Sequence, residues 1–217
     1  MKKFKIEKRP LYREEIKEAL MDAITAGELK PGDRIVETRW AKELGVSQSP
    51  IREAIRELEL IGMVESMPYK GSVVRQITKK DIADTYKVRI ALESMAIEEA
   101  VRRKDPETLE VMKSCLEQMI EGAEAGDVSR FVENDVRFHE AFINASDNDM
   151  LKRLWAQCYV RDNTKLSTMF SRDSLIELAR RHLLLINAIE SGDEQSGRQE
   201  IRMHFEMLLN SLDKTED

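Results

Sequence analysis

The chain has 217 residues, which is room for one large domain or two small ones, and 35% of them are charged while only 6% are aromatic. This balance is typical of helix-rich soluble proteins. The net charge of -6 by itself argues against nucleic-acid binding. Residues 1–76, however, hold 15 Lys and Arg against 13 Asp and Glu, so the acidic excess lies in the rest of the chain.

Neither a membrane protein nor a secreted one is expected. The amino terminus lacks the apolar core of a signal peptide, and no stretch approaches a membrane span. The two cysteines, Cys115 and Cys158, have no CxxC spacing and lie in helical periodicity. We therefore expect reduced side chains in the core of a cytoplasmic protein.

The amino-terminal part opens with a basic arm at residues 2–9, which predicts a disordered tail, or a phosphate-contacting arm if DNA is the partner. A helix is predicted next, because apolar residues recur at helical spacing from Ile16 to Ile24, before Gly27. Pro31 and Gly32 then turn the chain toward a second helical pattern.

Two short helices joined at Gly45 are predicted between residues 40 and 59. Apolar positions repeat at helical spacing on both sides of the turn: Trp40, Ala41 and Leu44 before it, and Ile51, Ile55 and Leu58 after it. Gln48, Arg52 and Arg56 share another face of the second helix. Such a row suits the major groove, where Arg reads guanine and Gln reads adenine, although an ordinary helical hairpin with a solvated basic face is the alternative.

The ends of the second helix carry their own signals. Ser47 or Ser49 is expected to cap its start, and Gly62 to end it. Two β-branched runs flanking residues 68–71 then predict a β-hairpin. A hairpin directly after a recognition helix is a wing.

These segments resemble a known family. PGDRI, then LGVSQSPIREAIRELELIGMVE and the hairpin with Lys-Gly, resemble the winged helix-turn-helix of the GntR family of bacterial transcription regulators over residues 12–75. By matching positions, the resemblance implies DNA contacts at the start of the recognition helix, in the wing near the minor groove and on the preceding helix: Ser47, Gln48, Ser49 and Arg52, then Lys70 and Gly71, and Arg39 on the backbone. Arg52 is the expected base contact. Many members have Arg where this chain has Gln48, so the operator sequence cannot be taken from the family.

The rest of the chain is expected to be all-helical. Helices are predicted from Asp81, from Asp105-Pro106 to Gly126, and over about 128–145, 149–170, 173–191 and 194–212. The predicted fold is mainly α, with a winged helix-turn-helix in residues 1–75, a linker in 76–80 and a helical bundle in 81–217.

Four titratable residues fall on apolar faces of three of these helices: Asp135 and His139 one turn apart, His182, and His204. Buried groups of this kind need partners, and one Asp with three neutral imidazoles is a good set for a divalent transition metal. The alternative is that each histidine is a hydrogen-bonded core residue and that Asp135 pairs with one of them.

The helical half resembles the FadR-type effector-binding domain of one GntR branch, in which many members carry Asp-x3-His on one helix and two further His on the last two. Asp135, His139, His182 and His204 match in order and type, which implies a metal, with zinc or nickel favoured and manganese or iron possible. The family often has Arg at the position of Arg89, which implies an anchor for a small carboxylate effector. An Arg89–Glu93 salt bridge at i, i+4 is the alternative.

The hypothesis for function is a ligand-responsive repressor that binds a palindromic double-stranded DNA operator as a homodimer, in the cytoplasm, and is not an enzyme. A metal-sensing regulator is one alternative. A metal-dependent hydrolase is another, because a metal with an open position could activate water. The sequence offers no HExxH motif and no evident general base for hydrolysis.

Overall fold

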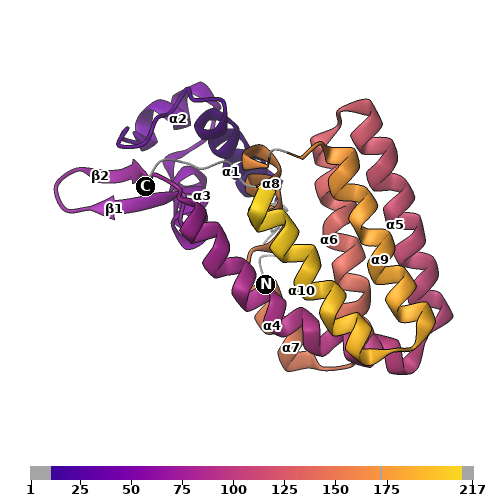
Figure 1. Cartoon of the computed structure of the whole chain (residues 1–217). Helices are drawn as coiled ribbons and strands as arrows, with labels where there is room; N and C mark the ends of the chain where they lie inside the picture. The colour runs from indigo at the N-terminus through magenta and orange to yellow at the C-terminus, as the bar shows by residue number, and fades with distance from the viewer. Residues whose placement is uncertain (1–10, 172, 212–217) are drawn as a thin grey trace, which may run out of the picture. The chain divides into compact units, whose positions relative to one another are not determined.

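The structure is a computed structural model that describes residues 11–171 and 173–211, so the basic arm at residues 2–9 lies outside the described residues. The chain divides into two compact units, Met1–Ile77 and Thr78–Asp217. Within the described residues the fold is mainly α, with a single two-stranded sheet in the first unit (Figure 1). The predicted fold class is therefore confirmed.

The first unit is a winged helix-turn-helix. Its elements in order are α1 (Leu11–Thr25), α2 (Glu37–Glu43), α3 (Gln48–Ile61), β1 (Val64–Met67) and β2 (Gly71–Val74). The helices close around α3, which contacts both α1 and α2 and buries Ile51 and Leu58 completely. The strands pair antiparallel, from Val64 opposite Val74 to Met67 opposite Gly71, so the predicted wing is present.

The turns of the first unit follow glycine, but the predicted burial of Leu44 is wrong. Gly62 ends α3 at φ +84, as expected of a residue without Cβ. Ser47 occupies the N-cap position of α3, but its side chain makes no capping hydrogen bond, and Ser49 lies inside the helix. Leu44, expected in the core, is 38% exposed because α2 ends just before it.

The second unit is a helical bundle. Its helices are α4 (Lys79–Arg103), α5 (Pro106–Ala125), α6 (Val128–Ala145), α7 (Asp149–Ala156), α8 (Val160–Phe170), α9 (Leu175–Ser191) and α10 (Glu194–Ser211). Helix α5 packs on α6 and α9, and α10 packs on α4 and α9. In Figure 1, α9 lies between α5 and α10. These contacts enclose a core in which Phe138 and Phe142 are completely buried.

Capping residues set where these helices begin. Asp105 caps α5, with Pro106 in the first turn, as predicted. The expected start of α4 at Asp81 is wrong by three residues, because Thr78 is the N-cap. Asp81 accepts from the Thr78 backbone N–H while the Thr78 hydroxyl accepts from Asp81 N, so the two form a capping box.

The single helix predicted over residues 149–170 is wrong. It is broken between α7 and α8, where Tyr159 adopts a left-handed backbone at φ +45. The Asn163 side chain donates to the carbonyl of Cys158 at 2.9 Å and to that of Tyr159 at 3.2 Å, which satisfies groups that the break leaves free. The redirected α8 turns Thr164 and Ser167 into the core.

None of the described helices is long and apolar enough to cross a membrane. The two cysteines are free thiols. Cys115 is buried, as expected, whereas Cys158 is only partly buried.

Candidate metal and effector site, and candidate nucleic-acid interface

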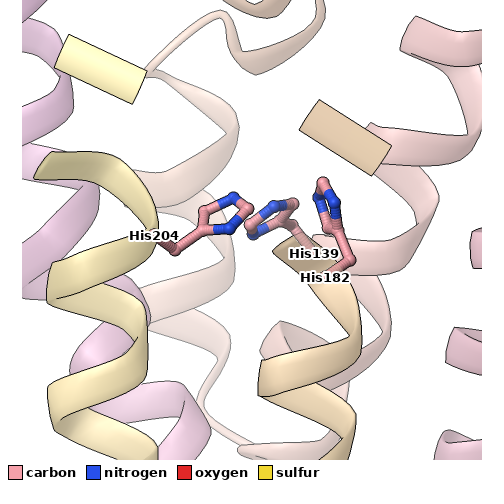
Figure 2. A group of neighbouring side chains, drawn as sticks. All are labelled: His139, His182 and His204. Atoms are coloured by element: carbon pink, nitrogen blue, oxygen red, sulfur yellow. The ribbon is translucent and has the colours of Figure 1, made fainter. Parts of the chain in front are cut away.

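Three histidines from three helices meet inside the second unit. His139 comes from α6, His182 from α9 and His204 from α10, and Figure 2 shows their rings turned toward one another. One ring nitrogen of each lies within 4.8 Å of the others. The three residues are only 1%, 1% and 9% exposed. The structure therefore brings together the histidines that the sequence placed on separate apolar faces.

Contacts of the Nδ1 atoms orient two of the rings. The Nδ1 atom of His139 lies 2.6 Å from Glu93 Oε2, and the Nδ1 atom of His182 lies 3.1 Å from the carbonyl oxygen of Leu178. If each Nδ1 carries the proton for its acceptor, each Nε2 keeps a free lone pair for a metal.

Two buried ring nitrogens have no hydrogen-bond partner among the described residues: His182 Nε2 and His204 Nδ1. Leaving such atoms unsatisfied in a core is costly. Burial, reinforced by the neighbouring His182 and His139, holds the pKa of His204 well below its usual value, so this ring is neutral at pH 7. Neutral imidazoles are the form that binds metals, so the residues present fit a divalent cation.

Asp135 joins the histidines from one turn earlier on α6. Its Oδ1 atom lies 3.1 Å from His182 Nε2, and its Oδ2 atom accepts from the Thr164 hydroxyl at 3.2 Å. Burial acts to raise the pKa of Asp135, but His182, His139 and Arg89 outweigh it and hold the pKa below its usual range. An ionised carboxylate therefore stands beside the three imidazoles.

Glu93 on α4 orders this site, although the sequence indicated it only as an ion-pair partner. It is completely buried and accepts from Arg89 Nε and Trp155 Nε1, each at 2.8 Å, in addition to its contact with His139. Burial acts to raise its pKa, while Arg89 and His139 more than reverse this and lower the pKa to about 2. His139 and Trp155 lie 46 and 62 residues away in sequence, so no local pattern links them to Glu93.

Arg89 forms the salt bridge to Glu93 that was the alternative interpretation, whereas its role as an effector anchor stays a prediction. Its side chain is 1% exposed and forms the salt bridge to Glu93, and its guanidinium carbon lies 4.8 Å from the centre of the Phe205 ring. Its Nη2 atom is nevertheless buried without a hydrogen-bond partner among the described residues. Arg89 lines a small cavity of about 30 Å³ together with Asp135 and the three histidines.

The residues matched to DNA contacts lie on exposed parts of the first unit. Ser47, Gln48 and Ser49 stand exposed at the start of α3. Arg52, one turn further, is 55% exposed, and its Nη2 atom lies 2.8 Å from Glu37 Oε2 on α2. Arg39 is likewise exposed and pairs with Glu43 at 2.8 Å.

Lys70 and Gly71 lie at the tip of the wing. Both are exposed, and Gly71 has a φ of +78, which favours a residue without Cβ. The preceding Tyr69 was not singled out in the sequence, yet it is fully exposed at φ +66. Because Tyr69 follows Pro68 in the predicted turn, its exposure could have been predicted from the sequence.

Comparison with known proteins places both units. Residues 12–74 match the family described as "Bacterial regulatory proteins, gntR family", and residues 84–207 match the FCD domain. The chain is 31% identical to the HTH-type transcriptional regulator YdhC of Bacillus subtilis over 209 residues, covering 94% of this chain and 92% of that one.

A second relative and one solved structure are also similar to the chain. The chain is 32% identical to the "Probable D-xylose utilization operon transcriptional repressor" of Paenarthrobacter nicotinovorans, with 93% and 88% of the two chains covered. The solved structure of E. coli McbR/YncC shares the fold, with a TM-score of 0.66 at 23% identity, over 92% of this chain and 97% of that one. The chain therefore belongs to the GntR family of bacterial regulatory proteins, with an FCD second domain, and is a DNA-binding transcription regulator rather than an enzyme.

Proposed function

We propose that the chain is a repressor that binds a two-fold symmetric operator as a homodimer, and that a small organic acid, bound beside a divalent metal in the helical unit, controls this binding. The observation that carries the proposal is that one cavity is lined by residues with buried polar atoms that make no hydrogen bond within the described part of the chain. The atoms are His182 Nε2, His204 Nδ1 and Arg89 Nη2. The first two fit a cation and the third fits an anion.

The metal ligands in this proposal are Asp135, His139, His182 and His204, with zinc or nickel favoured over manganese or iron. When bound, the ion supplies open coordination positions for a carboxylate oxygen. Glu93 holds the His139 ring in its orientation, and Thr164 holds the carboxylate of Asp135. Arg89 donates its free N–H to the effector, while its salt bridge to Glu93 keeps the guanidinium fixed.

At the DNA end, Arg52 is proposed to read a guanine after exchanging Glu37 for the base. Ser47, Gln48 and Ser49 contact DNA at the start of α3. Arg39, Lys70 and Gly71 contact the backbone and the minor groove from α2 and the wing. One recognition helix covers few base pairs, so a homodimer on a palindromic site supplies the specificity.

The effector must bind one arrangement of the two DNA-binding units better than another, because a ligand with equal affinity for both shifts nothing. Residues 1–75 would then act as the output of a sensor formed by residues 81–217. Both would work in the cytoplasm, where the operator lies.

The test begins with metal-loaded full-length protein and a library of random double-stranded DNA. Selection should enrich a sequence with two-fold symmetry, and elemental analysis should find about one metal per chain, consistent with the single histidine cluster. Adding small organic acids one at a time should lower the affinity for the selected DNA. Enrichment of asymmetric sequences would contradict the homodimer, and affinity that follows the metal alone would make the ion itself the signal.

A further inference from the structure

Tyr69, in the turn of the wing, is the most exposed large hydrophobic residue in the part of the chain that the structure describes. Its relative exposure is 105%, against 66% for Leu60, which comes second. Figure 1 shows the hairpin of β1 and β2 extending away from the helices of the first unit, with the turn at its far end. Because the Tyr69 side chain buries no surface, its ring contributes nothing to the core of this unit.

The backbone of the turn favours glycine at the position of Tyr69. The Lys70 N–H donates to the Met67 carbonyl at 3.2 Å, which closes a four-residue turn. Pro68 is the second residue of this turn and Tyr69 the third. Tyr69 has a φ of +66, the sign that the third residue of a type II turn requires. Glycine adopts this φ without strain and a bulky residue does not, so the fold of the wing does not explain a tyrosine here.

Three other non-glycine residues among those described have a positive φ, and their surroundings differ. Lys104, Asp147 and Tyr159 each lie between two helices of the second unit, where the chain must change direction. Lys104 and Asp147 are polar, and Tyr159 is partly buried. Of the four, only Tyr69 combines a left-handed backbone with a fully exposed aromatic ring. A strained residue that the fold does not explain points to a function.

The tip of the wing also carries positive charge. Lys70 is exposed and follows Tyr69 directly. Arg34 is exposed as well, and its Nε atom lies 3.5 Å from the point where a Cβ on Gly71 would stand, so the guanidinium lies against the wing. Residues 67–71 contain no acidic side chain. An aromatic ring accompanied by two cations suits a groove of DNA, which is lined by phosphates.

We propose that Tyr69 enters the minor groove of the operator and selects A·T over G·C pairs beside each half-site. This inference rests on the proposed function, which brings the wing to the minor groove. An A·T pair presents only acceptors there, adenine N3 and thymine O2, whereas a G·C pair adds the guanine amino group. The Tyr69 hydroxyl donates to these acceptors, and the guanine amino group obstructs it. The wing thus adds sequence information outside the base pairs that α3 reads.

The test uses base pairs that separate the two grooves. The operator selected from random DNA is prepared with A·T, G·C or inosine·cytosine at each position flanking the half-sites in turn. Inosine·cytosine has the major-groove pattern of G·C but lacks the amino group in the minor groove. For full-length wild type we expect G·C at one flanking position to weaken binding about tenfold, the scale of one mismatched pair, and inosine·cytosine to bind like A·T.

Three variants assign this preference to a side chain. Tyr69→Gly should bring the three duplexes to about parity without lowering the free energy of unfolding, because glycine accepts the positive φ. Tyr69→Phe, which removes only the hydroxyl, should lose the preference as well. Leu60→Ala is the matched control, because it removes an exposed apolar side chain from α3 of the same unit, and it should keep the preference.

Four outcomes would overturn the inference. Equal binding of all three duplexes by the wild type would do so and leave the proposed operator intact. Weak binding of both G·C and inosine·cytosine would show that the position is read in the major groove. A loss in Tyr69→Gly that is equal for the three duplexes would assign Tyr69 to the DNA backbone. If the wild type enriches no sequence from random DNA, both this inference and the proposed operator fail.

Discussion

Each unit of this chain contains an Arg–Glu ion pair, and the two pairs differ in their exposure to water. Arg52–Glu37 in the first unit and Arg89–Glu93 in the second each have a nitrogen and an oxygen 2.8 Å apart. The side chains of the first pair are 55% and 32% exposed, and those of the second are 1% and 0% exposed. Equal distances thus occur in very different surroundings.

The surroundings decide what each pair can do. An exposed pair contributes little to stability, because water and salt screen it, so Arg52 can leave Glu37 for DNA at small cost. A buried pair is costly to break, because either partner left alone is an unpaired charge in the core. In the proposed function, Arg89 and Glu93 are therefore fixed parts of the site, and Arg52 is an exchangeable contact.

The largest effect is expected from breaking the buried pair. Glu93→Ala removes the acceptor of Arg89, Trp155 and His139 together, and should lower the free energy of unfolding by about 3–5 kcal/mol. Urea unfolding of the full chain measures this loss. Glu99→Ala, on the same helix, breaks an exposed pair with Arg102 and should change stability little. Similar losses in both variants would show that burial does not separate the two classes of ion pair.

Metal addition should give the next largest effect. Zinc at 100 times its dissociation constant should raise the free energy of unfolding by about 2.7 kcal/mol, because the ion binds only the folded site. In His182→Ala combined with His204→Ala the increase should vanish, as should the zinc found by elemental analysis. Glu140→Ala, an exposed change beside His139, serves as control and should keep both. An undiminished zinc content in the double variant would rule out these ligands.

In the first unit, Arg52→Ala should weaken DNA binding and leave the fold intact. We expect roughly 10-fold to 100-fold weaker binding to the selected operator, the cost of one bidentate base contact, with relaxed specificity at a single base position. The free energy of unfolding should fall by less than about 1 kcal/mol, because the pair with Glu37 that is lost is exposed. Arg56→Ala, also exposed on α3, is the comparison, and its loss should be smaller and independent of sequence. An operator affinity that survives Arg52→Ala would displace this residue from the base contact.

The smallest effect is expected for Glu37→Gln, which removes the exposed partner of Arg52. The free energy of unfolding should fall by less than about 1 kcal/mol at pH 7. The hydrogen bond from Arg52 lowers the pKa of Glu37, so its contribution is present above the ordinary pKa of 4.5 and is lost as pH falls through the lowered value. The difference between wild type and variant should therefore disappear in acid, and a difference that grows there would contradict the assignment.

Local sequence signals predicted much of the fold. The β-branched runs around residues 68–71 gave the wing, Gly62 ended the recognition helix, and Asp105 with Pro106 began α5. The break between α7 and α8 could not be predicted in this way. No glycine or proline marks Tyr159, and the side chain that satisfies the broken turn, Asn163, acts only once the backbone has turned.

The candidate site, like the fold, could be predicted only in part from local sequence signals. Helical periodicity by itself determined that Asp135, His139, His182 and His204 face inward, because a side chain's direction follows from its phase on its own helix. Whether three helices bring those rings within 4.8 Å of one another depends on packing between residues far apart in sequence. Only the tertiary structure decided that convergence, the contact of Glu93 with His139, and the burial of Arg89 Nη2 without a hydrogen-bond partner among the described residues. Each of these depends on contacts between residues far apart in the sequence, and the periodicity of a single helix carries no information on such contacts.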